Sequence, residues 1–147
     1  MSTYSGGSDM ATAPRFWREN PSRYNLEGFK CNSCGKTYFP WREMCPVCHR
    51  KSVGKIETVQ LKGIGTVFSF SEVYEGLEEL SMQRPYIVAM VEMDEGARIT
   101  GQLIDCDPAD IKIGTRVRAT LRKLSEEGPS GVIHYGYKFV PLPQTPQ

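Results

Sequence analysis

Four cysteines form two pairs with the same internal spacing, Cys31-Asn-Ser-Cys34 and Cys45-Pro-Val-Cys48, with ten residues between the pairs. A Cys-x-x-Cys turn places two thiolates on one ion, and two such turns complete the tetrahedron that zinc prefers, with Zn–S distances of about 2.3 Å. Four protein ligands leave no open position for water or substrate. The spacing therefore predicts a metal site made by Cys31, Cys34, Cys45 and Cys48 that stabilises the fold and does no chemistry.

Other uses of these cysteines are less consistent with the pattern. Either pair alone is compatible with a redox dithiol or a disulfide, but two matched pairs favour a metal. Four thiolates do not distinguish zinc from iron, and we take zinc as the default. Gly35 and His49 directly follow the two pairs, where a tight turn favours residues that tolerate a left-handed conformation. We therefore interpret His49 as a turn residue and not as a ligand.

The segment before the cysteines has helical signals. Residues 1–12 are rich in Ser, Gly and Thr, and we expect them to be disordered. Residues 13–28 are expected to form two short helices, separated where Asn20-Pro21 ends the first and caps the second, with Gly28 as the stop.

Three aromatic residues of this helical arm, Phe16, Trp17 and Tyr24, give it more apolar surface than so short a segment buries by itself. They either fold back onto the protein or dock a partner, because exposed aromatic residues often act as interface anchors.

The metal ribbon is predicted within residues 29–60, of which residues 51–60 are expected to be a linker. Tyr38, Phe39 and Trp41 lie between the two cysteine pairs. We expect these rings to shield the metal and to form the small core of the ribbon.

Strand signals dominate from Lys62 onward. Alternating patterns or β-rich composition predict five strands, at residues 63–74, 86–93, 98–104, 116–122 and 132–140. In the fourth, apolar residues alternate with mostly basic ones. Asp94-Glu95-Gly96 predicts a hairpin turn, and residues 75–85 are expected to be a mobile loop. The protein is therefore predicted to be mainly β, with a five-stranded OB-type barrel at residues 61–141 and a tail at residues 142–147.

Charge and hydropathy exclude several classes of protein. The net charge is +1, and residues 62–147 carry nine basic against twelve acidic residues, a balance of −3. A phosphate-backbone binder would need a basic surface. The longest apolar stretches are too short to span a bilayer, and the first residues lack a signal-peptide pattern. We expect a cytoplasmic protein, and the unpaired Cys106 fits a reducing compartment.

The order of motifs is informative as a whole. Phe29-Lys-Cys-x-x-Cys-Gly35 is followed by Phe39-Pro40, Cys45-Pro-x-Cys48, Gly63-x-Gly65-x-Val67, Pro85-Tyr86-x-Val88-Ala89, Ile113-Gly114-x-x-Val117 and Phe139-x-Pro141. From about residue 14 onward the chain resembles the acyl-CoA-associated family that joins a rubredoxin-like zinc ribbon to an OB-fold. The resemblance implies a non-catalytic subunit that associates with thiolase-type or hydroxymethylglutaryl-CoA-synthase-type (HMG-CoA-synthase-type) enzymes and holds CoA thioesters. Some relatives are linked to hydratase-like partners.

A host for CoA needs a few cations at a rim, for the phosphates, and a narrow apolar groove for the pantetheine arm. Six basic residues are candidates for this acyl-CoA-binding rim: Arg84, Arg98, Arg116, Arg118, Arg122 and Lys123. Each of them is equally readable as a solvated surface residue.

Two other functions are compatible with parts of the sequence. Zinc ribbons and OB barrels also bind single-stranded nucleic acids, and Phe68, Phe70, Tyr74, Tyr135 and Tyr137 are candidates for base stacking, although the acidic balance of the barrel opposes this.

Independent catalysis is the weaker alternative. His134 lacks a recognisable nucleophile and carboxylate set, and Cys106 lacks a recognisable activating base.

Overall fold

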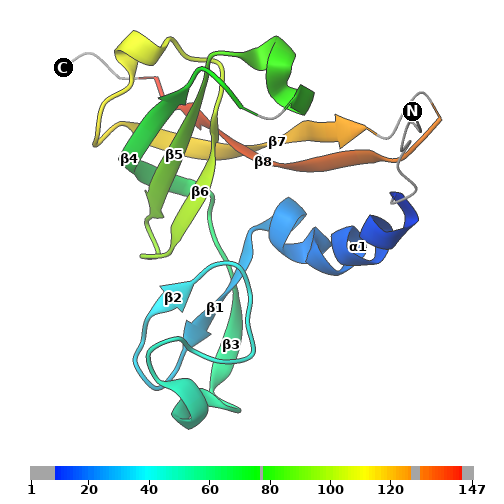
Figure 1. Cartoon of the computed structure of the whole chain (residues 1–147). Coiled ribbons are helices and arrows are strands. Elements are labelled where there is room, and N and C mark those ends of the chain that lie inside the picture. The colour runs from blue at the N-terminus through cyan, green and yellow to red at the C-terminus, as the bar shows by residue number, and fades with distance from the viewer. Residues whose placement is uncertain (1–8, 77, 127–129, 144–147) are drawn as a thin grey trace.

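The computed structural model describes residues 9–76, 78–126 and 130–143 of the chain. A helix, a small three-stranded ribbon and a five-stranded barrel follow one another in sequence. Figure 1 shows the ribbon beneath the barrel and the helix beside both. No helix of the described residues has the length and apolar character needed to cross a bilayer. Residues 1–8 and 144–147, parts of the expected tails, lie outside the described residues.

A single helix, α1 (Asp9–Asn25), replaces the two short helices that the sequence predicts. The prediction was wrong because Pro21 lies inside this helix and does not end it, although an interior proline costs about 3 kcal/mol. Contacts of α1 with the last barrel strand and the first ribbon strand offset this cost. The helix ends before Leu26, whose φ of 52° is left-handed, and residues 9–12 are helical rather than disordered.

The ribbon is an antiparallel sheet in the order β2-β1-β3, with β1 at Glu27–Cys31, β2 at Thr37–Tyr38 and β3 at Ile56–Gln60. β3 pairs with β1 along its whole length. The second half of the expected linker, residues 56–60, is therefore part of the sheet, and Gly28 lies inside β1 instead of stopping a helix. A lone strand leaves its backbone groups unpaired, so β1 requires this distant partner.

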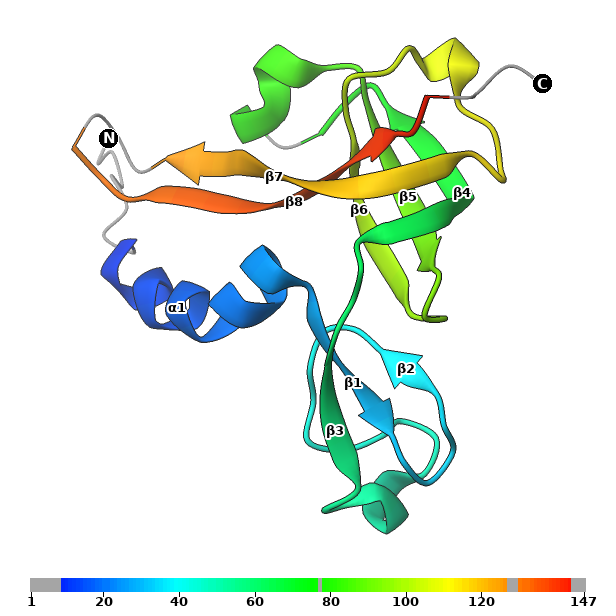
Figure 2. The same cartoon turned by 180° about the vertical axis from the view of Figure 1, so that it is seen from behind.

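The barrel strands are β4 (Ile64–Val73), β5 (Tyr86–Met93), β6 (Arg98–Leu103), β7 (Arg116–Glu126) and β8 (Ile133–Pro141). They close in the order β4-β5-β6-β8-β7, with β7 returning to β4. This closed barrel confirms the predicted OB-fold. Figure 2 shows that the outer ends of β7 and β8 extend past the other strands and run alongside α1.

Short turns and helices connect the strands. Gly96, with a φ of 87°, makes the tight β5–β6 turn as expected. The helix η3 (Pro108–Asp110) is capped by Asp107, whose carboxylate accepts a hydrogen bond from the Ala109 N–H at 3.0 Å. Within the expected loop, residues 78–83 form the 3-10 helix η2 (Glu78–Gln83). A further 3-10 helix, η1 (His49–Ser52), follows the second cysteine pair.

The main hydrophobic core fills the barrel, with Val67, Val91, Val117 and Phe139 almost completely buried. Phe68 and Phe70 alternate with Ser69 and Ser71 in the sequence, but both rings are exposed, at 45% and 39%. The pairing of β4 with β5 shifts register between Val67 and Ser69, so a β-bulge at this point breaks the period-two alternation.

The barrel is least tightly joined between β6 and β8. Leu103 and Phe139 are the one residue pair in register between these parallel strands, whereas β7 and β8 pair along nearly their full length. Gly101 lies in β6 beside this seam, and a Cβ there would stand 2.8 Å from the Phe139 ring. Glycine therefore lets the ring pack at the seam, and the earlier part of β6 is not paired with β8.

Candidate functional site

The two Cys-x-x-Cys turns have matching backbone geometry. The Gly35 N–H donates to the Cys31 carbonyl at 2.7 Å, and the His49 N–H donates to the Cys45 carbonyl at 2.9 Å. Both donor residues have positive φ, 73° for Gly35 and 48° for His49. The interpretation of His49 as a turn residue is thereby confirmed. Each turn directs the two thiols of its pair to one side, where they meet the other pair.

The four sulfur atoms of Cys31, Cys34, Cys45 and Cys48 lie within 4.8 Å of one another. The Sγ atoms of Cys34 and Cys45 are 3.7 Å apart. A tetrahedral ion with sulfur at about 2.3 Å would separate its ligands by about 3.8 Å. The residues present therefore fit a single four-coordinate metal ion.

The electrostatics of the cluster also favour a cation. Burial opposes ionisation of Cys45, but hydrogen bonds from the Cys48 and Val47 N–H groups, together with those from Tyr38 and Cys34, lower the pKa of this thiol. Burial and the neighbouring thiols raise the pKa of Cys48. Tyr38 places a buried hydroxyl near these sulfurs, and burial, followed by its hydrogen bond with Cys45 and then the charge of Cys45, raises its pKa. Four thiolates in one buried space need a cation to neutralise them.

A small shell supports the second cysteine turn. The buried Ser52 hydroxyl accepts a hydrogen bond from the Cys45 N–H at 2.9 Å and donates to the His49 carbonyl at 2.6 Å. Phe29 is fully buried and stacks on Tyr38 with ring centroids 5.2 Å apart. Of the aromatic residues expected to shield the metal, Tyr38 packs against this cluster.

Phe39 and Trp41 do not have the role that was expected of them. Phe39 leaves the ribbon and packs against the barrel core, where its ring meets Tyr137 edge to face at 5.6 Å. Trp41 is 44% exposed, and its indole N–H donates to the Thr58 hydroxyl at 3.1 Å. The expectation was wrong because the loop after β2 faces the barrel, which offers Phe39 a larger apolar surface than the ribbon does.

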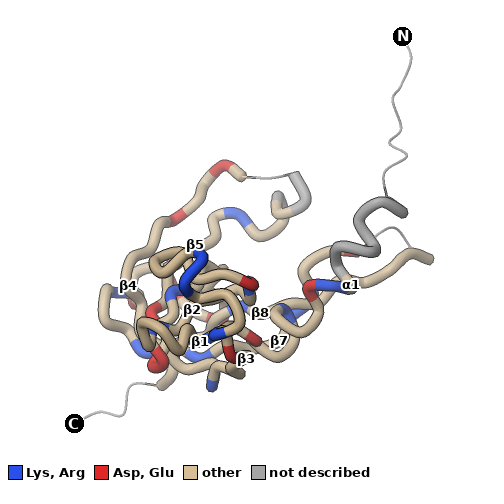
Figure 3. The backbone as a smooth tube through the Cα atoms, turned by 90° about the horizontal axis from the view of Figure 1, so that it is seen from below, with Lys and Arg blue, Asp and Glu red and all other residues tan. Residues whose placement is uncertain are grey.

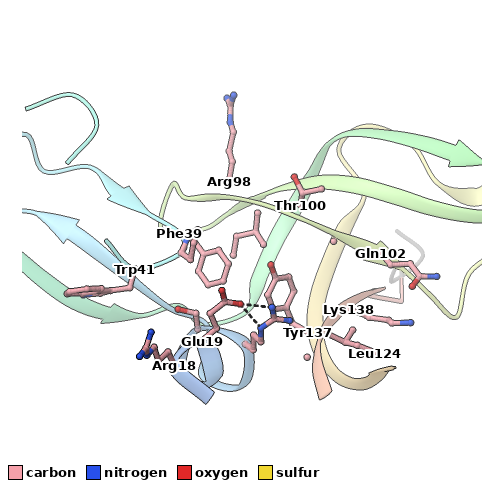
Figure 4. Close-up of a pocket in the computed structure, with 16 residues that line it drawn as sticks. Arg18, Glu19, Phe39, Trp41, Arg98, Thr100, Gln102, Leu124, Tyr137 and Lys138 are labelled. Carbon is pink, nitrogen blue, oxygen red and sulfur yellow. Dashed lines mark hydrogen bonds and ion pairs between the residues drawn. The ribbon is translucent and has the colours of Figure 1, made fainter. Parts of the chain in front are cut away.

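A groove of about 790 Å³ lies where α1, the loop after β2, β6 and the β7–β8 pair meet. Its volume is within the range of roughly 300–1,000 Å³ that small-molecule sites have. Figure 4 shows Phe39 and Tyr137 in the middle of this groove, Arg18 and Trp41 toward one end, and Gln102 and Lys138 at the other. The space between β6 and β8 thus becomes part of a site shared by all three parts of the fold.

The groove combines apolar rings with cations. Arg23 lies on its α1 wall and pairs with Glu19, with its Nε 3.0 Å from a Glu19 carboxylate oxygen. Burial raises the pKa of Tyr137, and the charge of Arg23 opposes that rise. Lys138 is only 6% exposed, and burial followed by the charge of Arg122 lowers its pKa. Such a surface suits a slim apolar ligand that carries anionic groups.

The six basic residues predicted to bind acyl-CoA do not form one cluster. Among them, Arg98 lines the groove within the described residues, but its guanidinium lies 3.9 Å from the Phe68 ring centroid and 3.2 Å from the Glu92 carboxylate. Figure 4 shows its side chain extending away from the groove. Arg84 donates to the Gly76 carbonyl at 2.6 Å, ahead of β5.

The other four lie on β7. Arg116 forms two hydrogen bonds with Asp94, at 2.7 and 2.9 Å. Arg122 contacts Asp105 at 3.2 Å, Lys123 pairs with Glu126, and Arg118 is exposed.

The predicted docking residues lie in α1. Trp17 is 76% exposed and Tyr24 is 43% exposed, so neither folds back fully onto the protein. Phe16 also lies in α1, but its side chain is outside the described part of the structure. An exposed tryptophan on a helix that borders the groove is consistent with a docking role.

Several groove residues were not identified from the sequence as acyl-CoA contacts. Arg18, Arg23, Tyr137 and Lys138 line the groove, yet they come from α1 and β8, far apart in the chain. The sequence carried no signal for Lys138, because alternation places it on the opposite face of the strand from Tyr137 and Phe139, where a charged residue is ordinary. Independent catalysis gains no support from Cys106, because burial and the adjacent Asp105 and Asp107 raise its thiol pKa.

Two domain families match the chain. The rubredoxin-like zinc ribbon domain of ChsH2 matches residues 18–54, and the C-terminal OB-fold domain of ChsH2 matches residues 58–122. A DUF35 domain-containing scaffold protein of Methanocaldococcus jannaschii is 47% identical over 87% of this chain and 89% of its own length.

More distant relatives carry names that include an enzyme. Benzoylsuccinyl-CoA thiolase subunit BbsA of Geobacter metallireducens is 38% identical over 53% of this chain and 49% of its own length. A solved structure, described as an Ltp2-ChsH2(DUF35) aldolase, matches with a TM-score of 0.64 and 26% identity, covering 93% of this chain and 97% of that one.

Proposed function

Because the chain belongs to the family of DUF35 domain-containing scaffold proteins, we propose that it is a non-catalytic subunit that holds acyl-CoA for an enzyme of the thiolase superfamily. The partner class is a thiolase-type or HMG-CoA-synthase-type enzyme. The names of the similar thiolase subunit and of the aldolase complex support an enzyme partner that acts on CoA thioesters or related carbonyl substrates. We place the protein in the cytoplasm, where thiols stay reduced.

The groove between helix, ribbon and barrel is the observation that supports acyl-CoA binding. Phe39 and Tyr137 give its middle an apolar surface, which suits the pantetheine arm. Arg18, Arg23 and Lys138 supply positive charge around it, which suits phosphates. The six cations predicted from the sequence remain candidates for an outer rim, with Arg98 nearest to this groove.

The metal of the ribbon is proposed to be zinc, with iron as the alternative in the same four-cysteine site. Cys31, Cys34, Cys45 and Cys48 would hold it. Bound there, the ion would fix the ribbon and thereby the loop that carries Phe39 to the groove. It would take no part in a reaction, since the four thiolates fill its coordination sphere.

Partner docking is proposed on the exposed side of α1, with Phe16, Trp17 and Tyr24 as contacts. A tagged full-length chain, isolated from its own cells, should recover a thiolase-type or synthase-type enzyme in near-equal amount. Trp17→Ala should lower that recovery, whereas Tyr74→Ala, which removes another exposed aromatic ring from the end of the barrel, should not. Equal recovery with both variants would argue against docking through α1.

Acyl-CoA binding is tested by isothermal titration of acetyl-CoA into the full-length chain, with and without the recovered enzyme. Thr100 is exposed on β6 and lines the groove, so Thr100→Trp should block binding by filling space without removing a core contact. Ser71→Trp on β4 adds the same bulk elsewhere and should leave binding unchanged. The proposal fails if the unmodified chain binds no acyl-CoA under either condition.

Single-stranded nucleic-acid binding is the alternative function. Its candidate aromatic residues lie in or just after β4 and in β8, two strands that are not neighbours in the barrel, and Tyr137 packs against the core. Figure 3 shows basic and acidic positions interspersed along the ribbon and barrel. Neither a continuous stacking platform nor a basic channel is evident in the described residues. Salt-dependent retention of single-stranded oligonucleotides at physiological ionic strength would favour this alternative.

A further inference from the structure

Lys138 is the most unusual charged residue of the barrel. It lies in β8 with 6% of its surface exposed, and lysine is almost never buried to this degree unless it is paired. Its Nζ atom has one hydrogen-bond partner among the described side chains, the Gln83 amide oxygen, at 3.4 Å. This long contact to a neutral acceptor leaves the ammonium charge without a compensating carboxylate in the described residues.

The groups around Lys138 favour an anion. In the β7–β8 register Thr120 faces Lys138, so Arg118 and Arg122 lie diagonally on either side of it on the same face of the sheet. Arg122 contacts Asp105 at 3.2 Å, whereas Arg118 has no such partner among the described side chains. The Gln102 amide donates to the same Gln83 oxygen at 3.1 Å and lies beside Lys138 at the end of the groove (Figure 4).

We propose that Lys138, assisted by Gln102, binds an oxyanion of the CoA thioester at the η2 end of the groove. An incoming phosphate or carboxylate oxygen would replace the distant contact with Gln83. It would also neutralise the buried Lys138 ammonium, which Arg122 repels in the free protein. Lys138 is thus a specificity-determining residue, and this inference rests on the proposed acyl-CoA function. The oxyanion is a phosphate of the nucleotide end or a carboxylate on the acyl group.

The free protein provides a first test. A lysine retained only for packing would make Lys138→Met neutral or destabilising. If the buried charge instead serves a ligand, Lys138→Met should raise Tm by a few degrees, because it keeps the alkyl volume and removes an unneutralised charge. Lys112→Met on the exposed loop before β7 is the matched control and should leave Tm unchanged. A lower Tm for Lys138→Met than for the unmodified chain would count against the inference.

Ligand titrations then decide between the two sources of the oxyanion. For CoA, dephospho-CoA and pantetheine, Lys138→Gln should weaken binding of the phosphate-bearing ligands about tenfold to a hundredfold, consistent with the loss of a charge-assisted hydrogen bond, while pantetheine binding is unchanged. Succinyl-CoA and butyryl-CoA are then compared in the same variant. If Lys138→Gln weakens binding of succinyl-CoA alone, the oxyanion that Lys138 binds is the acyl carboxylate instead. Lys138→Met should repeat whichever pattern is seen, and Lys112→Gln should show neither.

Failure of this inference is distinguishable from failure of the proposed function. If both Lys138 variants bind all of these ligands as the unmodified chain does, the oxyanion site is overturned and acyl-CoA binding stands. If the unmodified chain binds no CoA compound, the proposed function fails, and pyrophosphate becomes the probe. A pyrophosphate-induced shift of the Lys138 side-chain NMR signal, absent with Lys138→Gln, would then support the site, and an unshifted signal would overturn it.

Discussion

In the described part of the chain, the core cluster of the ribbon buries three residues, Phe29, Cys31 and Cys45, whereas the cluster centred on the barrel buries thirteen. Two of the three ribbon residues are proposed metal ligands. Apolar burial alone therefore gives the ribbon little stability, and a metal ion held by the four cysteines would supply most of it. The barrel depends on apolar packing and on strand pairing that closes on itself. Phe39 links the two, since it leaves the loop after β2 to join the barrel core.

The largest expected effect separates the two regions. Cys31→Ser should release the metal and unfold the ribbon, because metal binding contributes on the order of 10–16 kcal/mol to structural zinc modules. The barrel should stay folded. Metal analysis together with amide NMR spectra would measure both, with Cys106→Ser as a control that keeps the metal. Loss of the barrel signals as well would mean that the two regions fold as one unit.

The next substitution affects the barrel and removes the aromatic ring of Phe139. Phe139 is fully buried at the β6–β8 seam, so Phe139→Ala should cost about 3–5 kcal/mol of unfolding free energy. Denaturant unfolding would measure this loss in the barrel. Metal content should remain one ion per chain at low denaturant. A variant that also lost its metal there would contradict the independence of the ribbon.

Phe39→Ala tests the link between the regions. Its ring is half-buried against Tyr137, so the substitution should cost roughly 1–3 kcal/mol, less than full burial would imply. We expect the ribbon and barrel to unfold in more clearly separated steps, as followed by calorimetry. Val47→Ala on the exposed surface of the ribbon should leave the calorimetric profile unchanged. An unaltered profile for Phe39→Ala would show that this contact does not couple the regions.

The smallest effect concerns the surface of the barrel. A hydrogen bond from Arg116 lowers the pKa of Asp94, and this exposed pair joins the β5–β6 turn to β7. Its contribution is present above the unfolded-state pKa of about 3.9 and is lost as pH falls through the lower folded-state pKa. Asp94→Asn should therefore slightly lower barrel stability at pH 7 and have no effect at strongly acidic pH. An equal loss at both pH values would exclude the ion pair as its cause.

Local sequence patterns were enough to predict several elements of the fold. The predicted strand at residues 86–93 matches β5 because alternation and its bounding turns are local properties. The expected left-handed conformation at His49 was confirmed for the same reason. Where a distant partner decided the outcome, the prediction failed. Residues 56–60 became a strand only by pairing with β1, and α1 continues through Pro21 where it packs against β8 and β1.

The groove residues show the same limit. Arg23 and Tyr137 are more than one hundred residues apart in sequence, and no spacing rule connects them. Arg98 was among the predicted cations and lines the groove, whereas Arg116 forms an ion pair with Asp94 elsewhere on the barrel. Surface charge in a strand pattern indicates which face is polar, but it does not indicate which ion pairs form.

By itself the sequence determined the four-cysteine cluster and the order of a ribbon and a β-barrel, because thiolate spacing within one turn and alternation along one strand depend on neighbouring residues. Only the tertiary structure decided that Phe39 belongs to the barrel, that β6 and β8 are not paired along the part of β6 before Leu103, and that Lys138 is buried at the end of a groove. These features depend on contacts between elements distant in the chain, where packing and burial, not local propensity, set the free energy.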